Sequence, residues 1–106
     1  MSPLLLSLSL LAASQTIPRR DLALYYRRAC AECHGADGSA RSPLGFRLSG
    51  RAFSDARWQA RTKDDEMVKA ILKGKREMPA FGAQLSEAEA KALVTQVIRP
   101  MAARKP

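Results

Sequence analysis

The sequence has few of the residues that build metal clusters and none of the patterns that build sheets. Its 106 residues include two cysteines and a single histidine. A structural zinc site needs four ligands, usually Cys or His, and these two residue types supply three. No alternating apolar and polar stretch predicts a strand, so the βαβ pattern expected beside a thioredoxin-like cysteine pair is missing. These shortages argue against a zinc site and against a thioredoxin-like redox pair.

Acidic residues are also scarce relative to basic ones. There are 10 Asp and Glu against 18 Lys and Arg, which gives a formal net charge of +8 at pH 7. Such an excess favours acidic partners, whether proteins, nucleic acids or anionic membranes. The basic residues have no aromatic residues interleaved among them and form no basic helix, so we expect no nucleic-acid partner.

Long hydrophobic runs are absent except near the N-terminus, where "SPLLLSLSLLAAS" covers residues 2–14 without a charge. This run is shorter than the roughly 20 residues of a membrane-spanning helix, and no stable membrane span is expected. Ala12 and Ser14 are spaced as before a signal-peptidase site, which predicts a signal peptide over residues 1–14 and one domain over residues 15–106. Export to the periplasm or beyond follows. Because a basic n-region is missing, an uncleaved anchor at the membrane surface and a misplaced start codon remain alternatives.

A first helix is predicted over residues 20–35, "RDLALYYRRACAECHG", with Asp21 as its N-cap. From Gly35 to about Arg61 the chain is rich in Gly, Ser, Arg and Pro without a sustained period, which predicts a long irregular loop. Loops of that length in small domains usually wrap something. The helical face consists of Leu22, Tyr25, Tyr26, Ala29, Cys30 and Cys33.

Two further helices are predicted from their capping boxes and apolar stripes. Thr62 with Asp65 resembles a capping box that opens the first, and Ser86 with Glu89 forms the box that opens the second. Regular structure is expected to end at Pro100. The two stripes are Met67, Val68, Ile71 and Leu72, and Ala90, Leu93, Val94, Val97, Ile98 and Met101.

The segment "CAECHG", residues 30–35, contains both cysteines and the histidine of the chain. Cys30 and Cys33 are three residues apart on a helix and share one face, so both sulfurs can reach the two vinyl-derived carbons along one edge of a haem. His34 follows directly and can offer its imidazole to the iron. This is the C-x-x-C-H attachment signal of c-type haem. Thioether bonds would also consume thiols that outside the cytosol tend to oxidise to disulfides.

Together with "SPLG" and "EMPAFG", the latter at residues 77–82, this motif resembles a class I cytochrome c of the short bacterial kind over nearly all of residues 20–100. The resemblance implies an all-α cytochrome c fold, in which about three main helices and long loops wrap one haem. It also implies that this haem c, with its iron, is bound covalently through Cys30 and Cys33.

The resemblance further assigns the iron ligands and their neighbours. His34 is the proximal ligand, and the carbonyl of Pro43 would accept its hydrogen bond unless Pro43 is a simple turn residue. Met78 is the distal ligand, because the remaining methionines lie in the signal segment, on a helix stripe or near the terminus. Trp58 would donate to a haem propionate or be core, with Arg57 and Arg61 either pairing with propionates or solvated. The expected pocket wall is Leu44, Phe46, Phe53, Ile71, Leu72 and Phe81.

The function implied is electron transport by an exported monohaem cytochrome c that is not an enzyme and carries single electrons between redox proteins. One alternative is the haem subunit of an exported dehydrogenase or oxidase, and a second is a gas-binding sensor or peroxidase with a labile Met78. Its partners would be acidic redox proteins. The chain itself would be a monomer or part of a transient complex with them. A basic rim would steer them, unless its residues merely aid solubility; it consists of Arg27, Arg28, Lys73, Lys75 and Arg76.

Overall fold

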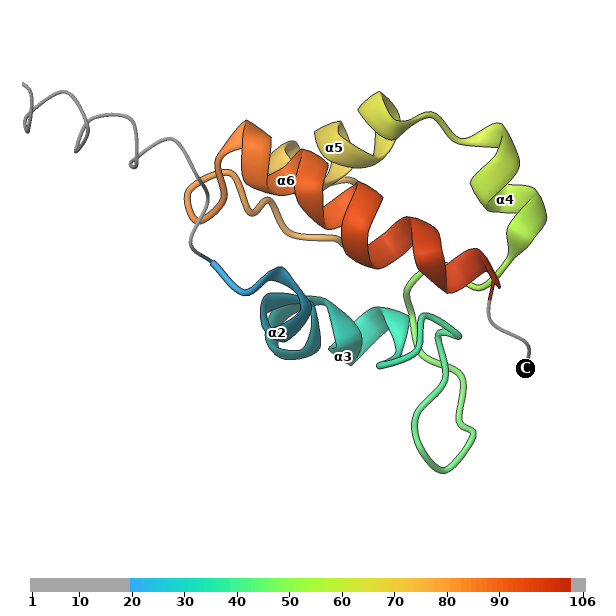
Figure 1. Ribbon diagram of the computed structural model, residues 1–106. Helices are drawn as coiled ribbons and strands as arrows, with labels where there is room; N and C mark the ends of the chain where they lie inside the picture. The colour runs from blue at the N-terminus through green and yellow to red at the C-terminus, as the bar shows by residue number, and fades with distance from the viewer. Residues whose placement is uncertain (1–19, 104–106) are drawn as a thin grey trace, which may run out of the picture.

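A computed structural model describes residues 20–103, which form helices joined by loops (Figure 1). The predicted signal peptide, residues 1–14, lies outside the described residues. Between residues 20 and 103 there is no strand, and two isolated bridges are the whole β content. Nor is any helix in that range long and apolar enough to cross a membrane. The elements are α2 (Leu22–Tyr25), η1 (Tyr26–Cys30), α3 (Ala31–His34), α4 (Ala56–Arg61), α5 (Asp64–Lys73), α6 (Glu87–Leu93), η2 (Val94–Ile98) and η3 (Arg99–Ala103).

The first predicted helix is confirmed as the continuous run α2, η1 and α3. The carboxylate of Asp21 accepts the N–H of Leu24 at 3.0 Å, which is the expected N-cap. The helix widens to π geometry over η1 and returns to α geometry in α3. It stops at Gly35, whose φ of 84° suits a glycine. Both cysteines therefore lie in the last turns of this helix.

The long loop after Gly35 is shorter than predicted, because α4 forms at its end. The carboxylate of Asp55 accepts the N–H groups of Arg57 and Trp58 at 3.0 and 3.2 Å. These bonds satisfy two of the four donors that a helix start leaves unpaired. The expectation of irregular structure to about Arg61 is therefore wrong for the last six residues.

The start of α5 also differs from the prediction by one residue. The side chain of Glu66, not Asp65, reaches back to accept the N–H of Lys63 at 3.0 Å. Thr62 does not cap this helix, because its hydroxyl donates to the Trp58 carbonyl at the end of α4. The shorter side chain of an aspartate reaches less far than that of a glutamate. The helix ends at Gly74, whose φ of 81° suits a glycine.

The capping box of the last helix is confirmed in both directions. The Glu89 side chain accepts the Ser86 N–H at 2.9 Å, and the Ser86 hydroxyl accepts the Glu89 N–H at 3.0 Å. The prediction that regular structure ends at Pro100 is wrong. The chain widens into the π segment η2 and then tightens into the 3₁₀ segment η3, where Pro100 is the second residue. Helices commonly tighten into 3₁₀ geometry near their C-terminal end, and Pro100 lies where that change begins.

The core forms where α6 and η2 pack against α2 on one side and α5 on the other, while α4 packs against η3. In Figure 1, α6 crosses the centre with α5 behind it and α2 and α3 below. Both predicted stripes supply this core, which confirms their inward orientation. Its buried members are Leu22, Tyr26, Phe53, Met67, Val68, Ile71, Leu85, Ala90, Leu93, Val94, Ile98 and Met101.

A polar network joins the last helix to α4. The buried amide of Gln59 donates to the carbonyls of Phe53 and Ile98, both at 2.9 Å. The guanidinium of Arg99 binds the Gln59 side chain at 2.9 Å and the Asp64 carboxylate at 2.7 Å. The amide and the guanidinium both have partners, so the network stabilises the fold instead of weakening it.

Replacing Gln59 by Leu should therefore destabilise the protein strongly. Two buried carbonyls would lose their donor, which costs about 2–3 kcal/mol and lowers Tm by roughly 10 °C or more in a domain of this size. Gln96→Leu is the matched control, since Gln96 is exposed on η2 and a surface change is worth about 0.5 kcal/mol or less. Thermal unfolding followed by circular dichroism measures both. Equal effects would show that the Gln59 network contributes nothing specific.

Candidate functional site

The two cysteines lie at the end of the first helix with different exposure. Cys30 is half-buried and packs against the core, Cys33 is exposed, and neither forms a disulfide. Burial, and next the charge of Cys33, raise the pKa of Cys30 to about 11. Reactive thiols of redox pairs have lowered pKa values. The raised pKa of Cys30 argues against a reactive redox pair.

His34, the last residue of α3, is held in one tautomer by a backbone carbonyl. Its Nδ1 lies 2.8 Å from the carbonyl oxygen of Arg51. A carbonyl can only accept, so Nδ1 carries the proton and Nε2 keeps its lone pair. Burial lowers the pKa of His34, against a smaller upward effect of this hydrogen bond, so the imidazole is neutral at neutral pH. A neutral imidazole with a free Nε2 is the form that binds iron.

The hydrogen bond of His34 was predicted to go to the carbonyl of Pro43. In the structure the carbonyl of Arg51 accepts it instead. Gly50, just before Arg51, donates its N–H to the Cys33 carbonyl at 2.7 Å. A Cβ at Gly50 would lie 2.5 Å from that oxygen and 2.7 Å from His34 Nδ1, so only glycine allows this approach. Pro43 lies in a hairpin formed by residues 40–48.

An aromatic stack covers one face of the His34 ring. The Phe53 ring lies nearly parallel to it, with centroids 4.2 Å apart and 15° between planes. Trp58 follows at 5.7 Å from Phe53, and the guanidinium of Arg51 lies 5.6 Å from the centre of the Trp58 ring. Trp58 is half-buried against Phe53. Arg57 and Arg61 on the same helix are exposed. The sequence analysis did not predict that the backbone of Gly50 and Arg51 would meet Cys33 and His34. The one sequence signal for this contact was the glycine itself, three residues after Arg47.

Met78 lies in a tight turn after α5. Lys75 and Met78 exchange two backbone hydrogen bonds, at 2.9 and 3.1 Å. The chain then returns along α5, where the N–H of Phe81 bonds to the Ile71 carbonyl at 2.8 Å. Both Met78 and Phe81 are half-buried and pack against the core, as does Leu72. The loop is thereby fixed to the helix, which gives the Met78 side chain a defined position.

The other methionines within residues 20–103 have structural roles. Met67 and Met101 are 5% and 3% exposed and belong to the core cluster. Met78 is therefore the loop methionine of the described chain, and it is half-buried where the other two are fully buried. Its role as an iron ligand stays a prediction.

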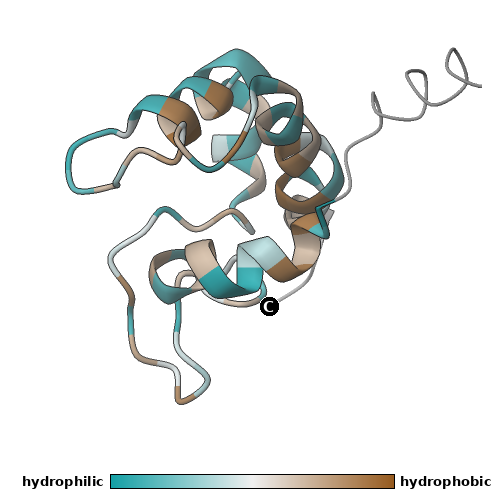
Figure 2. Cartoon of the chain, turned by 90° about the vertical axis from the view of Figure 1, so that its left-hand side faces the viewer, coloured by the Kyte–Doolittle hydropathy of each residue, from teal (hydrophilic) through white to brown (hydrophobic). Residues whose placement is uncertain are grey.

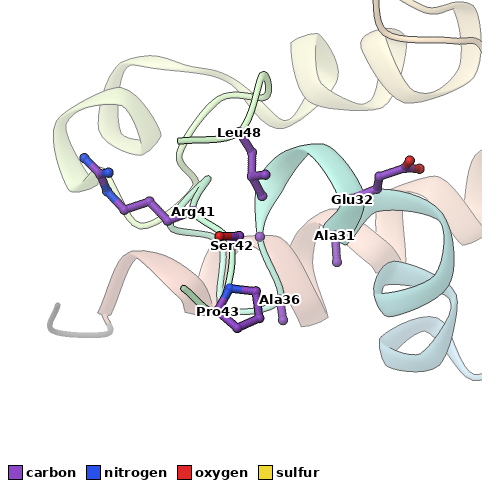
Figure 3. Close-up of a pocket in the computed structure, with 8 residues that line it drawn as sticks. Ala31, Glu32, Ala36, Arg41, Ser42, Pro43 and Leu48 are labelled. Atoms are coloured by element: carbon purple, nitrogen blue, oxygen red, sulfur yellow. The ribbon is translucent and has the colours of Figure 1, made fainter. Parts of the chain in front are cut away.

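Two residues predicted for the pocket wall lie on the hairpin of residues 40–48. Leu44 and Phe46 are 84% and 68% exposed at the tip of the hairpin. Gly45 between them has a φ of 92°, and its N–H bonds to the Ser42 carbonyl at 2.8 Å, which turns both side chains outward. Pro43 instead borders an open depression of about 310 Å³ between α3 and this hairpin (Figure 3), lined by Ala31, Glu32, Gly35, Ala36, Arg41, Ser42, Pro43 and Leu48.

No group of three or more His, Cys, Asp and Glu side chains between residues 20 and 103 could hold a metal ion. Two free thiols three residues apart and an adjacent neutral imidazole fit haem c.

Comparisons with known proteins point in the same direction. Residues 19–95 match the family model described as cytochrome c oxidase, cbb3-type, subunit III. A solved structure named KustC0563 c-type cytochrome is 36% identical, with a TM-score of 0.65 over 77% of this chain and 98% of that one. A tyrosine-to-phenylalanine mutant of that cytochrome is 34% identical, with a TM-score of 0.64 over 77% of this chain and 99% of that one. No curated protein matches the chain.

Proposed function

The chain belongs to the cytochrome c family as a small monohaem c-type cytochrome with the all-α cytochrome c fold, and from that premise we propose that it is an exported carrier of single electrons. Haem c, when bound, supplies the one-electron couple of ferric and ferrous iron. The observation that carries the proposal is His34, whose Nδ1 is occupied by the Arg51 carbonyl while Nε2 stays available.

Each site residue has a distinct part in this proposal. Cys30 and Cys33 would hold the haem by thioether bonds, and His34 and Met78 would be the protein ligands of its iron. An iron bound by both side chains would keep no open position for a substrate, which suits a carrier better than an enzyme. Phe53 orients the His34 ring by stacking on it, as outer neighbours of metal ligands commonly do.

A second candidate is a haem subunit permanently bound in a larger oxidoreductase. The match to a family model named for an oxidase subunit favours it. The chemistry is the same, but a bound subunit should co-purify with its partner at high salt, whereas a free carrier should elute alone.

Partner docking would use the basic rim, whose five residues are all exposed. Lys73 ends α5, and Lys75 pairs directly with Met78 in the turn. Arg27 and Arg28 lie in η1, just before Cys30. The rim thus places positive charge near Met78 and near Cys30. Such charge would steer an acidic redox protein toward the haem, since complementary charge raises the association rate more than the affinity.

Reversing Lys73 and Lys75 to Glu should slow electron transfer from a reduced acidic ferredoxin by about tenfold or more at low salt. The effect should fade as the Debye length falls from about 30 Å at 0.01 M to about 8 Å at 0.15 M salt. Stopped-flow absorbance gives the bimolecular rate. Reversal of Arg104 and Lys105 changes the net charge equally and is the control. A rate independent of salt, or equal effects of both pairs, would remove the docking role of the rim.

A further inference from the structure

Residues 40–48 form a hairpin that extends away from the helices (Figure 1). The N–H of Leu48 donates to the Ala40 carbonyl at 2.7 Å, and the N–H of Ser42 donates to the Phe46 carbonyl at 2.8 Å. At the tip, Gly45 with its positive φ closes the turn. These bonds give the hairpin a defined shape although few contacts surround it.

The tip of this hairpin is apolar and exposed. Leu44 and Phe46 are the exposed large apolar side chains of the described chain, at 84% and 68%. Pro43 beside them is exposed as well. In Figure 2 the lowest loop carries brown residues at its tip, with no other part of the molecule against them. Leu44 and Phe46, one on each side of Gly45, therefore place two large apolar side chains at the same exposed tip.

The hairpin is also cationic. Residues 38–54 contain three arginines and neither Asp nor Glu. Arg41 and Arg47 face each other across the two arms, and Arg51 follows on the returning chain; all three are exposed. An apolar tip with positive charge behind it complements a surface that is apolar inside and anionic at its boundary.

We propose that the hairpin docks on anionic lipid bilayers, with Leu44 and Phe46 in the interfacial layer and Arg41 and Arg47 against the lipid phosphates. A protein partner fits less well. The tip offers two large side chains, and their area is far less than the roughly 800 Å² per partner of a standard protein interface. A bilayer needs no complementary pocket, and peripheral binding is commonly built from one apolar and one cationic signal. This inference does not depend on the proposed electron-carrier function.

The stem of the hairpin is bonded to the haem-attachment motif itself. The N–H of Ala40 donates to the His34 carbonyl and that of Gly50 to the Cys33 carbonyl, both at 2.7 Å. A hairpin seated on a bilayer therefore fixes the orientation of Cys33 and His34 relative to that surface.

Sedimentation with lipid vesicles tests the proposal on the haem-loaded full chain. It should bind vesicles containing about a third phosphatidylglycerol more tightly than pure phosphatidylcholine vesicles, and less at high salt. Leu44→Ser with Phe46→Ser should reduce the partition coefficient about tenfold or more, without changing the haem spectrum or Tm. Arg47→Gln should weaken binding, whereas Lys69→Gln, an equal charge loss on α5, should not. All variants share residues 1–19, so any contribution of that segment is common to them.

A spectroscopic signal from the hairpin itself tests the proposal even if other parts of the chain dominate binding to vesicles. The three phenylalanines can be replaced by 4-fluorophenylalanine and observed by ¹⁹F resonance in the ferrous protein. Spin-labelled lipid in the vesicles should broaden the signal of Phe46 and leave that of buried Phe53 sharp. An unbroadened Phe46 signal would overturn the proposal. So would a serine variant that binds vesicles like the wild type but binds a redox protein more weakly, which would make the tip a protein-docking surface.

Discussion

The Met78→Ala variant should keep its haem but lose one of the two proposed protein ligands of the iron. The reduction potential of the haem should fall strongly. A thioether favours ferrous iron, so its loss should lower the potential by a sizeable part of the roughly 0.8 V range over which axial ligands tune haem. The opened position should accept CO in the ferrous state. A redox titration with optical spectra reports both effects.

The structure supports this expectation through the placement of the turn that carries Met78. Two backbone bonds with Lys75 close the turn, and the bond from Phe81 to Ile71 ties the following residues to α5. The side-chain position is therefore set by backbone contacts that the substitution leaves intact. The loop should persist in the variant, and the change in potential should report the missing sulfur.

Met67→Leu is the matched control for a methionine in the core. Met67 is 5% exposed on α5, and a swap of similar volume costs less than about 1.5 kcal/mol. Its potential and CO response should match the wild type. If Met67→Leu shifted the potential and Met78→Ala did not, the ligand assignment would be wrong. CO binding by the wild type at neutral pH would instead favour the gas-binding alternative.

The sequence predicted the features that depend on neighbouring residues. Asp21, Ser86 and Glu89 cap their helices as expected, because a cap involves residues within one turn of each other. The two stripes face the core because helical spacing alone decides which side chains share a face. Asp55 offered the same kind of signal for α4, and the irregular composition of the preceding loop obscured it.

The features that the sequence did not predict depend on where the chain returns in space. Whether Pro43 or Arg51 meets His34 depends on the turn at Gly45, which sends residues 41–47 outward and brings the following segment back. The stack of Phe53 on His34 and the exposure of Leu44 follow from the same turn. A pattern of residue types cannot fix such a path, because several turns suit the same glycine.

The double variant Cys30→Ala, Cys33→Ala should lose its haem entirely. Thioethers are the covalent links in the proposed site, so the wild-type haem should remain on the polypeptide in denaturing electrophoresis and resist acid-acetone extraction. A domain of this length has a modest core of its own, so loss of a large buried group should also leave the variant poorly folded. Haem staining and circular dichroism measure the two effects.

Single variants separate attachment from folding. Cys33→Ala and Cys30→Ala each keep one thioether, so haem should stay on both chains through denaturation. Cys30 packs against the core whereas Cys33 is exposed, so Cys30→Ala should lower Tm more than Cys33→Ala does. Both should hold His34 as an iron ligand, since its bond to the Arg51 carbonyl uses no cysteine atom. Release of haem from the wild type by acid-acetone would refute covalent attachment, whatever the single variants show.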